Sequence, residues 1–125
     1  MTPTPPVAPA SAPLAALADR LREFAVERDW QQFHSPKNLA MALVGEAGEL
    51  AAEFQWLTEA QSKAPDAAQL TRMRSECADV FNYLVRLADT LGIDLIAAAN
   101  DKIDDNARRY PVDKVRGSSK KYTEY

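Results

Sequence analysis

Apolar residues recur every three or four positions along four stretches of the chain, with polar residues between them. This spacing collects the apolar side chains on one face of an α-helix. The pattern predicts helices over about residues 14–29, 36–57, 67–91 and 94–110. The period-two alternation of a half-buried strand is almost absent. Four amphipathic helices joined by short connections predict an all-α, four-helix bundle-like fold.

Residues that favour helix boundaries stand at the ends of these stretches. Ser35 followed by Pro36 is typical of an N-cap and the first helical residue. Asp66 is a candidate cap for the third helix, and Gly92 is a natural stop behind it. Pro111 cannot continue the fourth helix. The expected connections are residues 30–34 and 58–66.

The first thirteen residues differ in composition from the remainder. They hold five of the eight prolines and no charged residue. A stretch of this kind buries little apolar surface, so we expect a disordered leader over residues 1–13. The expected helical domain spans residues 14–111, and a basic C-terminal tail follows over residues 112–125.

Charge, cysteine content and hydropathy exclude several classes of protein. The net charge of −3 argues against a chain that binds a nucleic acid polymer through its overall charge. No apolar run reaches the roughly 18–20 residues of a membrane span, so no membrane partner is expected. Cys77 is the one cysteine, which excludes an intramolecular disulfide, and its place among apolar residues predicts a buried thiol. A cytoplasmic location is the default expectation.

Two predicted helices each carry a pair of acidic residues three positions apart. The pairs are Glu46 with Glu49 and Glu76 with Asp79, and residues at this spacing are neighbours on one helix face. On a helical wheel of roughly 100° per residue, Glu46 and Glu76 lie beside the apolar face rather than opposite it. If the two helices pack antiparallel through their apolar faces, the four carboxylates would converge.

Converging carboxylates repel one another unless a cation lies between them. Hard divalent cations prefer oxygen ligands, and Mg²⁺ is the first candidate because a few carboxylates, waters and phosphates suffice to bind it. A di-iron bundle site would require Glu-x-x-His on two helices, and His34, the one histidine, lies in a predicted loop. The competing interpretation is that the acidic pairs only form solvated helix faces.

The last predicted helix carries a row of cationic and amide side chains. Lys102, Asn106 and Arg109 recur at the spacing of one helix face, and such a row can hold phosphates through charge-assisted hydrogen bonds. Acidic residues are interleaved with the row, so an ordinary charged surface is the alternative. Charge is unevenly distributed overall, with seven acids against three bases in residues 39–79 and seven bases against four acids from residue 102 onward.

Aromatic residues gather in and near the first predicted loop. Trp30, Phe33 and His34 stand together there, and Trp56 lies at the end of the second predicted helix. Aromatic rings on a loop can stack a nucleobase, although each of them alone is more often part of a core.

These motifs together resemble a known family. Glu46-x-x-Glu49 followed by Glu76-x-x-Asp79 resembles the metal signature of the all-α nucleoside triphosphate pyrophosphohydrolases, the MazG-like superfamily. The similarity is closest to the dCTP pyrophosphatase branch and covers residue 14 to the C-terminus. It extends to whole phrases of sequence: Glu27-Arg-Asp-Trp30, Gln32-Phe-His34, Leu43-Val-Gly-Glu-Ala-Gly-Glu-Leu50, Phe54-Gln-Trp56, Asp79-Val80 with Tyr83-Leu84, Arg108-Arg-Tyr-Pro111 and Ser118-Ser-Lys-Lys-Tyr-Thr-Glu124.

The resemblance implies a fold, an activity and roles for residues. It implies a MazG-type helical oligomer, most often a tetramer, that uses Mg²⁺ to hydrolyse dCTP or modified dCTPs to dCMP and pyrophosphate. The implied metal ligands and catalytic residues are Glu46, Glu49, Glu76 and Asp79. A carboxylate that is not fully committed to the metal could accept the proton of the attacking water, and on this chemical argument Glu49 is the candidate general base. The implied substrate-binding residues are Trp30, His34, Trp56, Tyr83, Lys102, Asn106 and Arg109. The basic tail would fold over the triphosphate.

Two other functions remain open at this point. One is a catalytically idle helical oligomer that binds nucleotides or a protein partner. The other is an enzyme of the same class that acts on dUTP or on a broad range of triphosphates. A smaller assembly, a dimer, also remains open.

Overall fold

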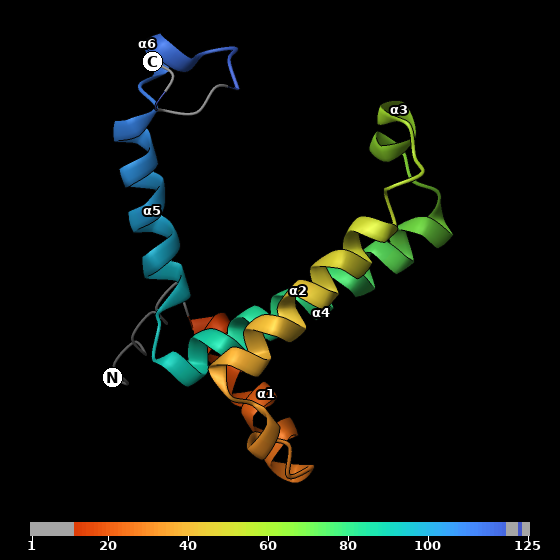
Figure 1. Ribbon diagram of the computed structural model, residues 1–125, viewed down its shortest axis with the longest axis vertical. Coiled ribbons are helices and arrows are strands. Elements are labelled where there is room, and N and C mark those ends of the chain that lie inside the picture. The colour runs from red at the N-terminus through yellow and green to blue at the C-terminus, as the bar shows by residue number, and fades with distance from the viewer. Residues whose placement is uncertain (1–11, 120–122, 124–125) are drawn as a thin grey trace, which may run out of the picture. The chain divides into compact units, whose positions relative to one another are not determined.

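The computed structural model describes residues 12–119 and residue 123. Within these residues all regular structure is helical, which confirms the all-α part of the predicted fold class (Figure 1). No helix of the described part is long and apolar enough to cross a membrane. The elements in chain order are α1 (Ala12–Glu27), the 3-10 helix η1 (Gln31–Phe33), α2 (Pro36–Ala52), α3 (Glu59–Lys63), α4 (Ala67–Leu91), α5 (Leu95–Arg109) and α6 (Val112–Val115).

Local capping signals place most of the helix ends. The Ser35 hydroxyl accepts a hydrogen bond from the Asn38 backbone N–H at 3.2 Å, as expected of an N-cap. Asp66 caps α4 by accepting from the backbone N–H of Gln69 at 2.8 Å. Gly92 adopts φ = 66°, the left-handed conformation that ends a helix with little strain when no Cβ is present. These three predicted boundaries are confirmed.

Other predicted boundaries were wrong. α1 begins at Ala12, two residues before the predicted start, because proline is tolerated in a first helical turn. α2 ends at Ala52 rather than residue 57, and the chain then turns, with the Leu57 N–H donating to the Phe54 carbonyl at 2.9 Å. The predicted connection 58–66 contains the short helix α3. The prediction of disorder for residues 1–11 lies outside the described residues.

The helical hairpin of α2 and α4 is the centre of the first of two compact units, which ends at Gly92. The two helices run antiparallel and in contact, and α1 packs against α4 (Figure 1). Five apolar residues are buried in the described part: Ala25, Leu39, Met73, Val85 and Ala88.

Much of the apolar surface of this unit remains exposed. Met41 and Val44 on α2 are 61% and 66% exposed. Cys77 is also exposed, so the prediction of a buried thiol was wrong. The residues of α4 that are buried are Met73, Val85, Arg86 and Ala88, so the packing of α1 and α2 leaves Cys77 uncovered.

The second unit begins at Ile93 and contains α5 and α6. On α5, three cationic side chains approach the single carboxylate of Asp105. Their nitrogens lie 3.9 Å (Lys102), 3.6 Å (Arg108) and 3.4 Å (Arg109) from its oxygens.

Candidate metal centre and adjoining pocket

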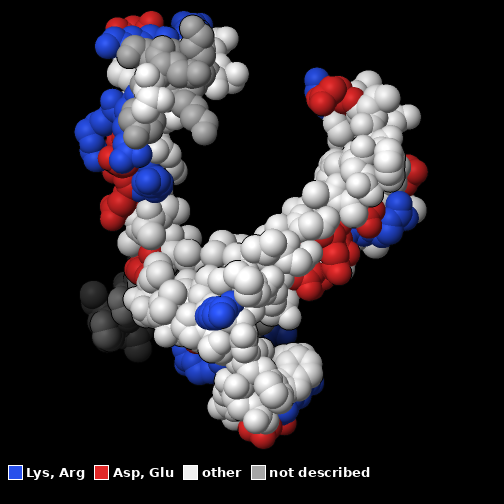
Figure 2. Space-filling model, in the orientation of Figure 1, with Lys and Arg blue, Asp and Glu red and all other residues white. Residues whose placement is uncertain are grey.

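Three carboxylates from two helices converge on the α2–α4 hairpin. Glu46 and Glu49 are one helical turn apart on α2, and Glu76 faces them from the antiparallel α4. One carboxylate oxygen of each residue lies within 4.8 Å of the corresponding oxygens of the other two. Figure 2 shows acidic side chains gathered along this hairpin. The antiparallel packing assumed from the sequence therefore brings three of the four predicted acidic residues together.

The inner oxygens of this cluster lack partners. Oε2 of Glu46 and Oε2 of Glu76 are buried and accept no hydrogen bond. Burial raises the pKa of Glu46, and the neighbouring carboxylate of Glu49 raises it further. Burial also raises the pKa of Glu76, again with Glu49 as the next largest cause. Burial and the neighbouring charge both disfavour the ionised form of these two carboxyl groups, so the three ionised carboxylates destabilise one another unless a cation lies between them.

A hard divalent cation fits this donor set. A buried carboxylate oxygen without a partner is unfavourable, and a cation between the three carboxylates would supply the missing partner and offset their repulsion. The ligand atoms are all carboxylate oxygens, which suit Mg²⁺ or Ca²⁺ better than metals that prefer nitrogen or sulfur. Glu46, Glu49 and Glu76 are therefore the residues that could hold such an ion.

Asp79 links the carboxylate cluster to a neighbouring pocket. Asp79 lies one turn after Glu76 on α4 and is not among the three residues whose carboxylate oxygens lie within 4.8 Å of one another. Its charge raises the pKa of both Glu46 and Glu76. Its side chain lines a pocket of about 430 Å³ between α1, the loop before α2, and α4. The pocket is lined by Leu17, Arg20, Leu21, Phe24, Trp30, His34, Asp79, Asn82, Tyr83 and Arg86.

The turn after α1 delivers two predicted residues to this pocket. Asp29 adopts φ = 54°, a left-handed conformation that aspartate tolerates better than most residues. The Asp29 carbonyl and side chain both accept from the Gln32 amide, at 3.0 and 3.1 Å. The following Trp30 packs edge-on against Phe24 with ring centroids 5.7 Å apart. Trp30 and His34 thereby reach the pocket wall.

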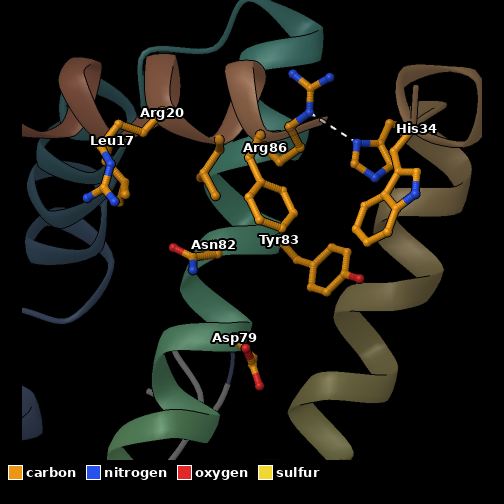
Figure 3. Close-up of a pocket in the computed structure, with 10 residues that line it drawn as sticks. Leu17, Arg20, His34, Asp79, Asn82, Tyr83 and Arg86 are labelled. Carbon is orange, nitrogen blue, oxygen red and sulfur yellow. Dashed lines mark hydrogen bonds between the residues drawn. The ribbon is translucent and has the colours of Figure 1, made fainter. Parts of the chain in front are cut away.

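Residues of α4 form the facing wall. Asp79, Asn82, Tyr83 and Arg86 recur at the spacing of one helix face, and Figure 3 shows them succeeding one another along α4. Sequence reasoning selected Asp79 and Tyr83 but not Arg86. The signal that would have found Arg86 is this polar row of residues within an otherwise apolar stretch of the helix.

Arg86 is the buried charged residue of the described part, with 8% of its surface exposed. Its Nε donates to His34 Nδ1 at 3.2 Å, the contact drawn as a dashed line in Figure 3. Its Nη1 donates to Asp89 Oδ2 at 3.2 Å. Asp89 also pairs with Arg22 of α1, at 2.6 Å from Nη2, and this hydrogen bond is the largest cause of its lowered pKa.

Other residues predicted to bind substrate lie elsewhere. Trp56 is 87% exposed, lies in the turn after α2 and does not line this pocket. Lys102, Asn106 and Arg109 lie on α5 in the second unit, where Lys102 and Arg109 approach Asp105.

In a comparison with known protein families, residues 42–125 match the sequence model of the MazG-like family. The human protein dCTP pyrophosphatase 1 is 50% identical over 104 residues, covering 82% of this chain and 61% of its own length. The protein of that name from Bos taurus is 49% identical over 105 residues, covering 82% of this chain and 62% of its own length. The chain thus spans about three-fifths of the curated relatives it matches.

A solved structure shares the fold. The crystal structure of a pyrophosphatase from Archaeoglobus fulgidus matches with a TM-score of 0.76 and 34% sequence identity. The match covers 84% of this chain and 98% of that one.

Proposed function

The chain belongs to the MazG-like family, and on that premise we propose that it is a Mg²⁺-dependent nucleotide pyrophosphatase that hydrolyses dCTP to dCMP and pyrophosphate. The observation that carries the proposal is the cluster of Glu46, Glu49 and Glu76, in which Oε2 of Glu46 and Oε2 of Glu76 are buried without a partner. Asp79, one helical turn after Glu76, lines the pocket. The substrate follows the relatives, which are named dCTP pyrophosphatase 1 and share about half of their aligned residues with this chain.

The four acidic residues would have two roles in catalysis, metal binding and proton acceptance. Glu46, Glu49, Glu76 and Asp79 would hold Mg²⁺, which when bound neutralises the triphosphate and makes a water more acidic. Glu49 is the exposed member of the three-carboxylate cluster, so it would be the one to accept the proton of the attacking water. Little covalent participation by the protein is required, because phosphoanhydride cleavage depends mainly on positioning and charge neutralisation.

The pocket would receive the nucleoside. Its volume of about 430 Å³ is in the range that small-molecule sites occupy. Trp30 and Tyr83 offer ring faces for stacking, and His34 offers a polar edge. Trp56 lies outside the pocket of its own chain, and we propose that it contributes to the pocket of a neighbouring copy.

The second unit would bind the triphosphate. Lys102, Asn106 and Arg109 on α5 are the proposed phosphate-binding residues, and the basic residues of the tail 112–125 would close over the phosphates. Lys102 and Arg109 pair with Asp105 of the same helix, and phosphate oxygens would replace Asp105 as their partner.

We further propose that the chain assembles as a homo-oligomer, with a tetramer favoured by the family resemblance and a dimer as the alternative. The first unit buries few apolar side chains, whereas Met41, Val44 and Phe81 are 61%, 66% and 46% exposed on α2 and α4. Figure 2 shows a broad surface of the hairpin without charged side chains. Association would remove such a surface from water. Light scattering behind size-exclusion chromatography measures the assembly directly, and a monomer would refute this part of the proposal.

The proposed setting is the cytoplasm, where the enzyme would clear dCTP or modified dCTPs from the nucleotide pool. A single cysteine, Cys77, suits a reducing compartment. The proposed partner is the nucleoside triphosphate substrate, and neither a nucleic acid polymer nor a membrane is part of the proposal.

The experiment that tests the activity follows pyrophosphate release from dCTP by the purified chain with MgCl₂. Release is expected to stop with EDTA and in Glu49→Gln and Asp79→Asn, and to continue in the control Glu23→Gln, which changes an exposed glutamate of α1. A chain whose melting temperature rises with dCTP but that releases no pyrophosphate would be an idle nucleotide-binding protein. Relative kcat/KM for dCTP, 5-methyl-dCTP, dUTP and dTTP separates a dCTP enzyme from a dUTP or broad-range one.

A further inference from the structure

A chain of hydrogen bonds runs from α1 through α4 to the loop that carries His34. Arg22 of α1 binds Asp89 of α4 through Nη2 at 2.6 Å and through Nε at 3.1 Å. Asp89 accepts from Arg86 at 3.2 Å, and Arg86 donates to Nδ1 of His34 at 3.2 Å. The guanidinium group of Arg86 is therefore held through two nitrogens, Nε by His34 and Nη1 by Asp89, and Asp89 is in turn held by Arg22 of α1.

The direction of the Arg86–His34 hydrogen bond determines where the imidazole carries its proton. A guanidinium group only donates hydrogen bonds, so Nδ1 of His34 must be unprotonated. Burial, followed by the charge of Arg86, lowers the pKa of His34, which keeps the ring neutral near pH 7. The single proton of the neutral ring then sits on Nε2. Among the described residues Nε2 has no hydrogen-bond partner, so it is available to a ligand.

The position of this pair in the pocket indicates which part of a ligand it meets. Arg86 lies seven residues after Asp79 on α4, about 10 Å along the helix axis. The carboxylate cluster, where phosphates would be held, lies at the Asp79 end. Figure 3 shows His34 and Arg86 at the end of the pocket away from Asp79. They would therefore face the end of a bound nucleotide that is away from its phosphates.

We propose that Arg86, held in place by Asp89, is a positioning residue that keeps His34 as the neutral tautomer protonated at Nε2. The pocket then offers the nucleoside an N–H donor, which selects a hydrogen-bond acceptor on the base. The proposal rests on the proposed function in one respect, that a nucleoside occupies this pocket. The acceptor is a carbonyl oxygen or an unprotonated ring nitrogen, which a pyrimidine presents on its polar edge.

The tautomer can be observed without substrate, because the chain contains one histidine. Long-range ¹H–¹⁵N correlation spectra of the full chain labelled with ¹⁵N-histidine report the protonation of both ring nitrogens at neutral pH. We expect Nε2 protonated and Nδ1 unprotonated in the unchanged chain. In Arg86→Met, we expect the Nδ1 resonance to move toward the average of two exchanging tautomers. A proton on Nδ1 in the unchanged chain, or identical spectra in the two proteins, would overturn the proposal.

Kinetics on dCTP test whether the tautomer serves binding. His34→Ala removes the proposed donor and is expected to raise KM about tenfold with a smaller change in kcat. Arg86→Met leaves the imidazole in place but free to exchange between tautomers, so it is expected to raise KM by a smaller factor. If Arg86 acts through His34, the double variant Arg86→Met/His34→Ala is no weaker than His34→Ala alone. Additive losses would instead mean that Arg86 contacts the ligand itself, and would overturn the positioning role.

Two further proteins control the interpretation. Arg74→Gln removes an exposed arginine from the same helix and is expected to leave both the spectrum and KM unchanged. Arg86→Lys retains the charge and is a second test if Arg86→Met fails to fold. Its single ammonium cannot reproduce the guanidinium geometry, so the Nδ1 resonance is expected to shift partway. If the chain hydrolyses no triphosphate, the proposed function fails, whereas the spectra still decide the tautomer.

Discussion

Replacement of Glu46 by glutamine is expected to stabilise the metal-free chain while it removes a metal ligand. One carboxylate oxygen of Glu46 and one of Glu49 lie within 4.8 Å of each other, and Oε2 of Glu46 is buried without a partner. A neutral amide removes the repulsion and can donate to a neighbouring carboxylate. At the dielectric constant of water two charges at that distance repel by about 0.9 kcal/mol, before screening by salt. We therefore expect Glu46→Gln to be about 1 kcal/mol more stable than the unchanged chain in EDTA.

Differential scanning calorimetry measures this difference. For a chain of this size 1 kcal/mol corresponds to a rise in melting temperature of about 3–6 °C. Because the folded-state pKa of Glu46 is raised, the unchanged chain loses stability as the pH rises above the ordinary glutamate pKa and through the raised value. The advantage of Glu46→Gln should therefore grow with pH over that range and disappear in acid, where the carboxyl group is protonated in both states.

Added MgCl₂ should reverse the order of stability. Metal bound only by the folded chain raises the melting temperature of the unchanged protein with concentration, and Glu46→Gln should respond much less. Glu23→Gln, on the exposed face of α1, should follow the unchanged chain in both conditions. A lower melting temperature for Glu46→Gln in EDTA, or an equal response of both proteins to MgCl₂, would refute the reasoning from repulsion and metal binding.

Three other substitutions test the fold and the pocket. Leu39 is 1% exposed, so Leu39→Ala should destabilise the chain by about 2–5 kcal/mol in denaturant titrations. Arg22 lowers the pKa of Asp89, so the stability that Asp89 contributes is present above the ordinary aspartate pKa and is lost as the pH falls through the lowered value. The melting temperature of Asp89→Asn should therefore fall less steeply in acid than that of the unchanged chain. Trp56→Ala should leave stability within about 0.5 kcal/mol and raise KM for dCTP, whereas an unchanged KM would remove Trp56 from the site.

The parts of the fold that the sequence predicted are those specified by near neighbours in the chain. Ser35 and Asp66 cap their helices through backbone groups three residues away, and Gly92 ends α4 through its own φ angle. The start of α3 is also specified by near neighbours. The Thr58 hydroxyl accepts from the Gln61 backbone N–H at 3.1 Å, and the Gln61 side-chain oxygen accepts from the Thr58 backbone N–H at 3.0 Å. The helix α3 therefore has a local signal in the sequence, although the segment 58–66 is predicted above only as a connection.

The carboxylate cluster could be predicted because two local spacings and one packing assumption determine it. Glu46 and Glu49 share a face by their separation of three residues, and an antiparallel partner helix then brings Glu76 to them. The bracing of His34 could not be predicted in this way. The Arg86–His34 hydrogen bond joins residues that are 52 positions apart in the chain, and the Arg22–Asp89 hydrogen bond joins residues that are 67 positions apart. No periodicity in the sequence specifies which arginine meets which partner.

Product analysis tests the central claim most directly. Purified chain, dCTP and MgCl₂ are incubated, and the products are resolved by anion-exchange chromatography and ³¹P NMR. The account predicts dCMP and pyrophosphate in equal amounts, with neither formed in EDTA or by Glu49→Gln. Formation of dCDP and inorganic phosphate, or intact dCTP after incubation of the metal-loaded protein, would contradict it.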